Sequence, residues 1–185
     1  MKKQLRYVSL VIGLLLAVVA FSVSAHDRDN TVRARLVGTQ EVPVVSTEAH
    51  GEFEARIEDN QITFKLSYEG LEGGNTLFAH IHLGQRSVNG GVMAFLCGGS
   101  TKPTPCPNIS GTVEGTITAA DILETGANAN TPKSPQQLPA GAFDEFLRAL
   151  RNGTAYANVH TQQSPGGEIR GQIREDNGRH RGNDH

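Results

Sequence analysis

The sequence has little of what marks several large classes of protein. It contains no tryptophan and only two cysteines, and aromatic residues make up 5% of its 185 positions. Seventeen basic residues are interspersed with nineteen acidic ones, which gives a formal net charge of −2 at pH 7. Proteins that bind nucleic acid need a concentrated basic surface to neutralise phosphates, so we expect no nucleic-acid partner. The length suits a single domain of ordinary size.

Long apolar runs are absent apart from one near the N-terminus. Three basic residues among the first six precede an apolar segment over 8–23, which ends in the small residues of Val23-Ser24-Ala25. This order is typical of a secretory signal peptide, and the run is short for a membrane span, which needs ~20 apolar residues. We therefore predict a cleaved signal peptide at 1–25, a secreted or periplasmic protein, and no stable membrane span after cleavage. An uncleaved membrane anchor is the alternative.

The two cysteines, Cys97 and Cys106, flank a segment rich in glycine, threonine and proline. In an oxidising compartment, two cysteines in one loop are expected to pair. We predict a disulfide that holds this loop rather than the whole fold. The alternative is a thiolate metal site, which the absence of a Cys-x-x-Cys spacing disfavours.

Much of the remaining sequence alternates between apolar and polar residues, as β-strands do when one face is buried. Residues 51–57 and 62–68 alternate regularly, and Asp59-Asn60 between them provides a turn, so the pair predicts a hairpin. Further strands are expected at 32–37, 77–83, 92–96, 111–118, 155–161 and 168–173. Short antiparallel strands separated by glycine-rich turns predict an all-β sandwich or barrel.

One short helix is expected among the strands, near residues 141–152. Four apolar residues recur there at helical spacing, and Gly153 follows where a helix commonly ends. The four are Phe143, Phe146, Leu147 and Leu150. The β domain is predicted over 32–174, after a linker at 26–31 and before a polar tail at 175–185 that we expect to be disordered.

Three histidines form the pattern with the most chemical content. In a strand, residues two apart share a face, so the apolar residues around His80 and His82 point to the core and both imidazoles point outward. The same alternation turns His160 outward from strand 155–161. Neutral imidazole is a common ligand for copper and zinc. We predict a transition-metal site at His80, His82 and His160, with copper favoured over zinc; the alternative is a set of polar or hydrogen-bonding residues that hold no metal.

Two further residues bear on this site. Arg170 is expected on the outward face of strand 168–173, beside Glu168 and Gln172. Its guanidinium either holds a carboxylate, that of Glu168 or Glu41, or offers a fixed positive charge to a small anion. Cleavage after residue 25 would also leave His26 at the N-terminus, where an amine and an imidazole can chelate copper; the alternative there is a mobile, solvated residue.

Several motifs resemble one family along nearly the whole mature chain. They are residues 36–43, residues 79–84, residues 155–161 and the segment 165–173. In this order they resemble the CHRD (chordin-type) domain, which is repeated in chordin and occurs singly in many exported microbial proteins. Chordin binds extracellular growth factors of the bone morphogenetic class, so the resemblance implies an extracellular setting, with an extracellular protein as one expected partner.

A more local resemblance is chemical. His80-Ile81-His82, Val159-His160 and Arg170 are similar, in this order, to the copper ligands and the anion-guiding arginine of copper,zinc superoxide dismutases. The chain departs from that family because it has no bridging histidine after Gly84, no zinc-binding loop and no long-range disulfide. The resemblance therefore implies copper binding more than dismutase activity. Both resemblances imply a Greek-key antiparallel β-sandwich.

Three hypotheses for function follow. The first is an exported CHRD-type protein that binds copper; the second is a metal-free extracellular interaction module; the third is a copper-only enzyme similar to superoxide dismutase. Whether the protein is an enzyme stays open at this point. The first and third hypotheses require the ring nitrogens of His80, His82 and His160 to lie about 2 Å from one common point, as metal–imidazole bonds demand.

Overall fold

The computed structural model describes residues 30–125 and 136–176. The predicted signal peptide, His26 and all but the first two residues of the predicted tail lie outside these ranges. Nine strands are present: β1 Thr31–Val37, β2 His50–Ile57, β3 Ile62–Glu69, β4 Thr76–Leu83, β5 Gly91–Cys97, β6 Gly111–Ile117, β7 Ala155–Thr161, β8 Ile169–Gln172 and β9 Arg174–Glu175. Two 3-10 turns, η1 Gly38–Gln40 and η2 Ala119–Asp121, and the helix α2 Phe143–Arg151 complete the described elements.

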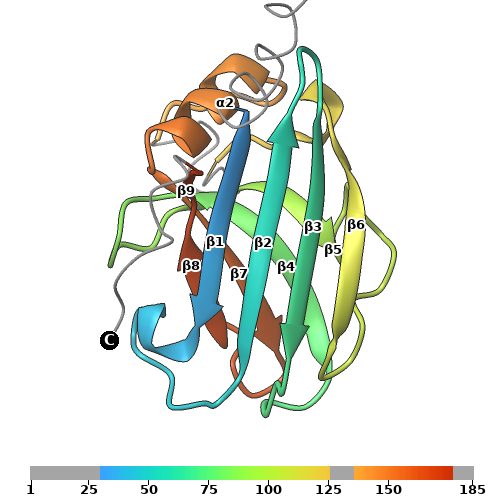
Figure 1. Ribbon diagram of the computed structural model, residues 1–185, viewed down its shortest axis with the longest axis vertical. Coiled ribbons are helices and arrows are strands. Elements are labelled where there is room, and N and C mark those ends of the chain that lie inside the picture. The colour runs from blue at the N-terminus through green and yellow to red at the C-terminus, as the bar shows by residue number, and fades with distance from the viewer. Residues whose placement is uncertain (1–29, 126–135, 177–185) are drawn as a thin grey trace, which may run out of the picture.

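The strands form one antiparallel sheet that folds into two layers. The hydrogen-bonded order is β5-β4-β7-β8-β1-β2-β3-β6, with β9 paired to β1. Figure 1 shows β1, β2, β3 and β6 in front and β5, β4, β7 and β8 behind them. The β1–β8 pairing joins the layers on one side, and β5 and β6 contact each other on the other, so the sandwich is nearly closed. The predicted all-β fold is confirmed, and the order β7-β4-β5-β6 is a Greek key.

Alternating burial places the core between the two layers. Strand β2 alternates strictly, with Phe53, Ala55 and Ile57 buried and Glu54 and Arg56 exposed. The predicted hairpin is present, since Phe53 faces Leu66 and Ile57 faces Ile62 across β2 and β3. Apolar side chains from both layers thus form a single core cluster.

Helix α2 begins and ends close to its predicted limits. It buries Phe146, Leu147 and Leu150 against the end of the sandwich, while Phe143 is only half-buried. Gly153, predicted to follow the helix, has a φ of 68°, a left-handed conformation that glycine adopts without strain. Figure 1 shows the helix at the end of the sandwich near β9.

The ordered strands extend slightly beyond the predicted domain limits. Strand β1 begins at Thr31, and Glu175 pairs with Val32, so the first residue of the predicted disordered tail lies in strand β9. The backbone amide of Asp176 also donates to the carbonyl of Thr31. These hydrogen bonds hold residues 174–176 beside the start of β1.

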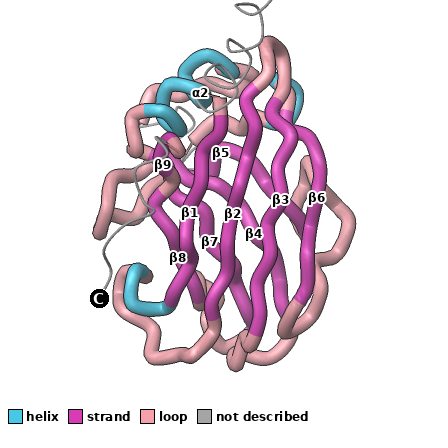
Figure 2. The backbone as a smooth tube through the Cα atoms, viewed as in Figure 1, coloured by secondary structure: helices cyan, strands magenta, loops and turns pink. Residues whose placement is uncertain are grey.

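Cys97 and Cys106 are joined in a disulfide, as predicted. The loop between them closes on itself through hydrogen bonds from Gly98 to Thr104 and between Gly99 and Lys102. Figure 2 shows this and the other loops gathered at the ends and margins of the strands. Among the helices of the described ranges, none is both long and apolar enough to cross a membrane.

Candidate metal centre

The register of β4 and β7 brings the three histidines together. His80 faces Asn158 across the two strands, His82 faces Tyr156, and Phe78 faces His160. Directly opposed residues of antiparallel strands share one face of the sheet. Their apolar neighbours belong to the core cluster and the histidines do not, so the imidazoles lie on the face of this layer that is turned away from the core, as predicted.

Although they point away from the core, the three histidines are buried. His80 and His160 are each 4% exposed and His82 is 9% exposed. Two loops fold back over this face of the sheet, since His82 Nδ1 contacts the carbonyl of Gly90 at 2.8 Å and His160 Nδ1 contacts that of Pro165 at 2.9 Å. Strand alternation predicts the face correctly but does not show that loops cover it.

In each of the three imidazole rings, one buried nitrogen has no hydrogen-bond partner. With the ring proton on Nδ1, His82 and His160 donate to the two carbonyls, and each Nε2 keeps its lone pair. Three buried ring nitrogens have no hydrogen-bond partner: His80 Nδ1, His82 Nε2 and His160 Nε2. Buried polar atoms are nearly always paired, so three orphaned acceptors at one place indicate a missing donor or a missing cation.

The three imidazoles also converge in space. Each offers one ring nitrogen, and these nitrogens all lie within 4.8 Å of one another. Metal–imidazole bonds of about 2.0–2.1 Å place two ligand nitrogens roughly 3.3–4.1 Å apart. His80, His82 and His160, called the histidine triad below, are thus grouped closely enough that they could hold a single metal ion.

Burial keeps the triad in the neutral form that binds metals. Loss of solvent lowers the pKa of both His82 and His160 from 6.5 to about 4. The pKa of His80 falls furthest, because burial is reinforced by the charges that the other two rings would carry. All three imidazoles are thus neutral at physiological pH, with lone pairs available for coordination.

Aromatic rings enclose the triad. Phe78 stacks on His80 with ring centres 5.2 Å apart, and Phe95 meets the same imidazole edge-on at 5.3 Å. Tyr156 lies nearly parallel to His82, with ring centres 4.6 Å apart. These contacts restrict ring rotation and exclude water. Alternation along 155–161 puts Tyr156 on the same face as His160, but its place against His82 depends on the strand register, which the sequence does not show.

Arg170 is buried, and the hydrogen bonds of its guanidinium go to loop 84–90 rather than to Glu168, one of the two carboxylates considered as its partner. The guanidinium donates to the side chain of Asn89 and to the carbonyls of Gln85 and Val88, and its carbon lies 3.4 Å from the ring centre of Tyr156. It therefore holds loop 84–90, the loop whose Gly90 carbonyl orients His82.

Glu168 is instead occupied elsewhere. Its carboxylate accepts hydrogen bonds from the backbone amides of Glu72 and Gly73 and from the hydroxyls of Thr47 and Thr161. Although desolvation acts in the opposite direction, these donors hold the pKa of Glu168 below its usual value. Glu168 precedes β8 and turns away to join three chain segments, so its place cannot be inferred from strand alternation.

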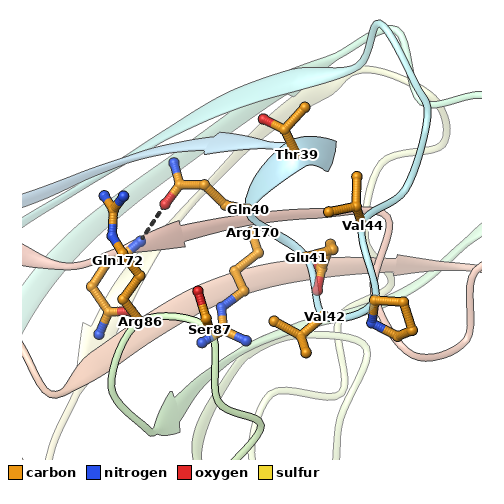
Figure 3. Close-up of a pocket in the computed structure, with 10 residues that line it drawn as sticks. Thr39, Gln40, Glu41, Val42, Val44, Arg86, Ser87, Arg170 and Gln172 are labelled. Atoms are coloured by element: carbon orange, nitrogen blue, oxygen red, sulfur yellow. Dashed lines mark hydrogen bonds between the residues drawn. The ribbon is translucent and has the colours of Figure 1, made fainter.

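Glu41 is the carboxyl group that acts on Arg170. Burial raises the pKa of Glu41 to about 7, and attraction to Arg170 opposes this rise. Both residues line a cavity of about 310 Å³ beside the triad loops, together with Gln172 (Figure 3). Glu41, the other carboxylate considered as a partner of Arg170, thus lines the same cavity and attracts the guanidinium electrostatically.

Comparison with known proteins gives one finding. A family model described as the CHRD domain matches residues 32–173, well over half of the chain. Comparisons with the curated proteins and with the solved structures found no match. The matched range contains strands β2 to β8 and all but the first residue of β1, ends just before β9, and includes the whole histidine triad.

Proposed function

The chain belongs to the CHRD domain family, and from this premise we propose that it is an exported protein that binds copper through His80, His82 and His160. The observation that carries the proposal is the convergence of three buried, unpartnered imidazole nitrogens. A structural role alone would leave these acceptors unsatisfied, at about 1–3 kcal/mol each. Coordination of one cation satisfies all three.

The composition of the donor set favours copper over zinc. It consists of imidazole nitrogens, with no thiolate or carboxylate among the grouped residues. For a given nitrogen site, Cu(II) binds more tightly than Zn(II), and structural zinc sites almost always have four protein ligands. A three-nitrogen site is therefore better suited to copper.

Export is supported by two independent features. The N-terminal segment has the composition of a signal peptide, and the Cys97–Cys106 disulfide is of a kind that persists in oxidising compartments. A secreted or periplasmic location is therefore part of the proposal. This location also fits an extracellular protein partner. The histidines of the triad are too buried to contact such a partner themselves.

A copper-only dismutase similar to superoxide dismutase is the second candidate function, and Arg170 is the residue that bears on it. The guanidinium is held by three acceptors and the ring of Tyr156, which favours a structural role over anion guidance. Superoxide dismutation by the copper-loaded protein should therefore not exceed that of an equal amount of free copper. Activity well above that level, lost in Arg170→Ala with copper retained, would favour the enzyme.

Metal analysis of the purified mature protein tests copper binding. After exposure to copper and removal of excess, we expect about one copper per chain in the unaltered protein and in His50→Ala. His50 is a suitable control because it lies on the surface, where its ring pairs with Glu69. His80→Ala should lose most of the copper while remaining folded. Equal copper in His80→Ala and His50→Ala would contradict the proposal and favour a metal-free interaction module.

A further inference from the structure

The ligands of the histidine triad carry no negative charge. Its three donors are neutral imidazoles, and among the residues that the structure describes no carboxylate or thiolate joins them within 4.8 Å. Asn158, which faces His80 across the strands, contributes a neutral amide whose buried Oδ1 has no partner. An ion bound here would therefore keep its full formal charge.

The groups behind the ligands are also neutral. Metal-bound histidines often donate their second ring N–H to a carboxylate, which increases the electron density on the ligand and offsets the charge of the metal. Here His82 and His160 donate to the backbone carbonyls of Gly90 and Pro165. The second layer thus orients the rings without adding an anion.

The surroundings oppose a high positive charge. Phe78, Phe95 and Tyr156 pack on the triad and present aromatic carbon rather than solvent. The guanidinium of Arg170 lies on the ring of Tyr156, which stacks on His82, so a fixed positive charge stands beside the site. Glu41 is the acidic residue among those that line the cavity, and Arg86 and Arg170 line it too, so the cavity supplies no net negative charge to the site.

We propose that the triad selects copper in its monovalent state and binds Cu(I) in preference to Cu(II) and Zn(II). This inference rests on the proposed copper-binding function. The free energy of transferring an ion from water into a medium of low polarity grows with the square of its charge, so a divalent ion loses about four times as much hydration free energy as a monovalent ion of equal size. Neutral ligands compensate for less of this lost hydration free energy than anionic ligands would, and the shortfall is larger for the divalent ion. Three nitrogen donors in an apolar enclosure therefore favour Cu(I).

Affinity measurements on the unaltered mature protein test the preference directly. Competition with a Cu(I) chelator in the absence of oxygen, and with chelators of Cu(II) and Zn(II), gives three dissociation constants on one protein. We expect the Cu(I) constant to be lower than the other two by about a thousandfold, equivalent to about 4 kcal/mol. Equal affinities, or tighter binding of either divalent ion, would overturn the inference while leaving copper binding intact. Failure of every ion to bind would instead contradict the proposed function.

An isosteric variant tests the electrostatic cause. Asn158→Asp places a carboxylate beside the triad without a change of size, and Asn60→Asp adds the same charge at an exposed turn. Asn158→Asp should bind Cu(II) and Zn(II) at least tenfold more tightly than the unaltered protein, with a smaller change for Cu(I); Asn60→Asp should leave all three constants unchanged. If a folded Asn158→Asp keeps the original ratio, or if Asn60→Asp shifts it as much, the charge argument is wrong. Should Asn158→Asp not fold, the measurement on the unaltered protein decides alone.

Discussion

Arg170 illustrates how a single buried residue acts on the triad through its neighbours. Its hydrogen bonds fix loop 84–90, and Gly90 in that loop accepts the Nδ1 proton of His82. The same guanidinium covers Tyr156, which stacks on His82. Two separate contacts thus fix the orientation of one ligand.

Arg170→Gln should therefore weaken copper binding without removing a ligand. Loss of a group that orients a metal-bound histidine typically lowers affinity by about 10–100-fold, and we expect a decrease in this range. Arg170→Lys keeps the charge but lacks the planar fork that reaches several acceptors, so it should recover only part of the affinity. Chelator competition on the three proteins measures both effects. Unchanged affinity in a folded Arg170→Gln would show that the loop does not position His82.

Glu41 gives the protein a measurable pH dependence. Its pKa is about 7 in the folded state and 4.5 as a free side chain. Between these values the unfolded chain has released the proton and the folded chain retains it, so rising pH favours unfolding. Glu41→Gln cannot ionise and removes this term.

Relative to the unaltered protein, metal-free Glu41→Gln should therefore gain stability as the pH rises from about 4.5 to 7. The change across this window should be on the order of 2–3 kcal/mol. Denaturant unfolding of both proteins at several pH values measures it, and the comparison cancels the opposite effect of the buried histidines. A stability difference that stays constant with pH would show that Glu41 ionises normally in the folded protein.

At the scale of elements, the strand pattern was predictable and the loops were not. Alternation identified β2 and β3 because each has one buried and one exposed face. In β7 every residue is buried, yet alternation still assigned its residues to the two faces of the sheet, because those on the core side are apolar and those on the other side are polar. What alternation could not supply is the cover over His82 and His160, since loop positions depend on distant partners such as Arg170. Glu168 was misplaced for the same reason.

The disulfide loop after β5 should matter locally. Cys97 and Cys106 are nine residues apart, and closing so short a loop removes little entropy from the unfolded chain, worth about 2–3 kcal/mol. The double variant Cys97→Ala with Cys106→Ala should lose stability by no more than this amount and should keep its copper. Chemical denaturation and metal analysis check the two statements. If the double variant lost both its copper and its folded structure at ambient temperature, the disulfide would instead support the whole sandwich.

At the scale of the whole molecule, the sandwich acts as a rigid frame for the triad. His80 and His82 come from β4 and His160 from β7, two directly paired strands, while the covering loops follow β4 and β7. Asn89 connects the first of these loops to the segment after η1 and to β8, since its side chain donates to Val42 and accepts from Arg170. Positions fixed by strand register need little reorganisation to bind an ion. The fold could be predicted from the sequence, and so could the face of the sheet on which the three histidines lie, whereas the enclosed character of the site required the structure.

X-ray absorption at the copper edge of the loaded mature protein tests the central claim most directly, because it reports the atoms bound to the ion. We predict a first shell of about three nitrogen atoms near 2 Å, with the outer-shell scattering of imidazole rings, and loss of this signal in His80→Ala. A shell dominated by oxygen or sulfur, or an imidazole signal that persists unchanged in His80→Ala, would contradict copper binding by the triad.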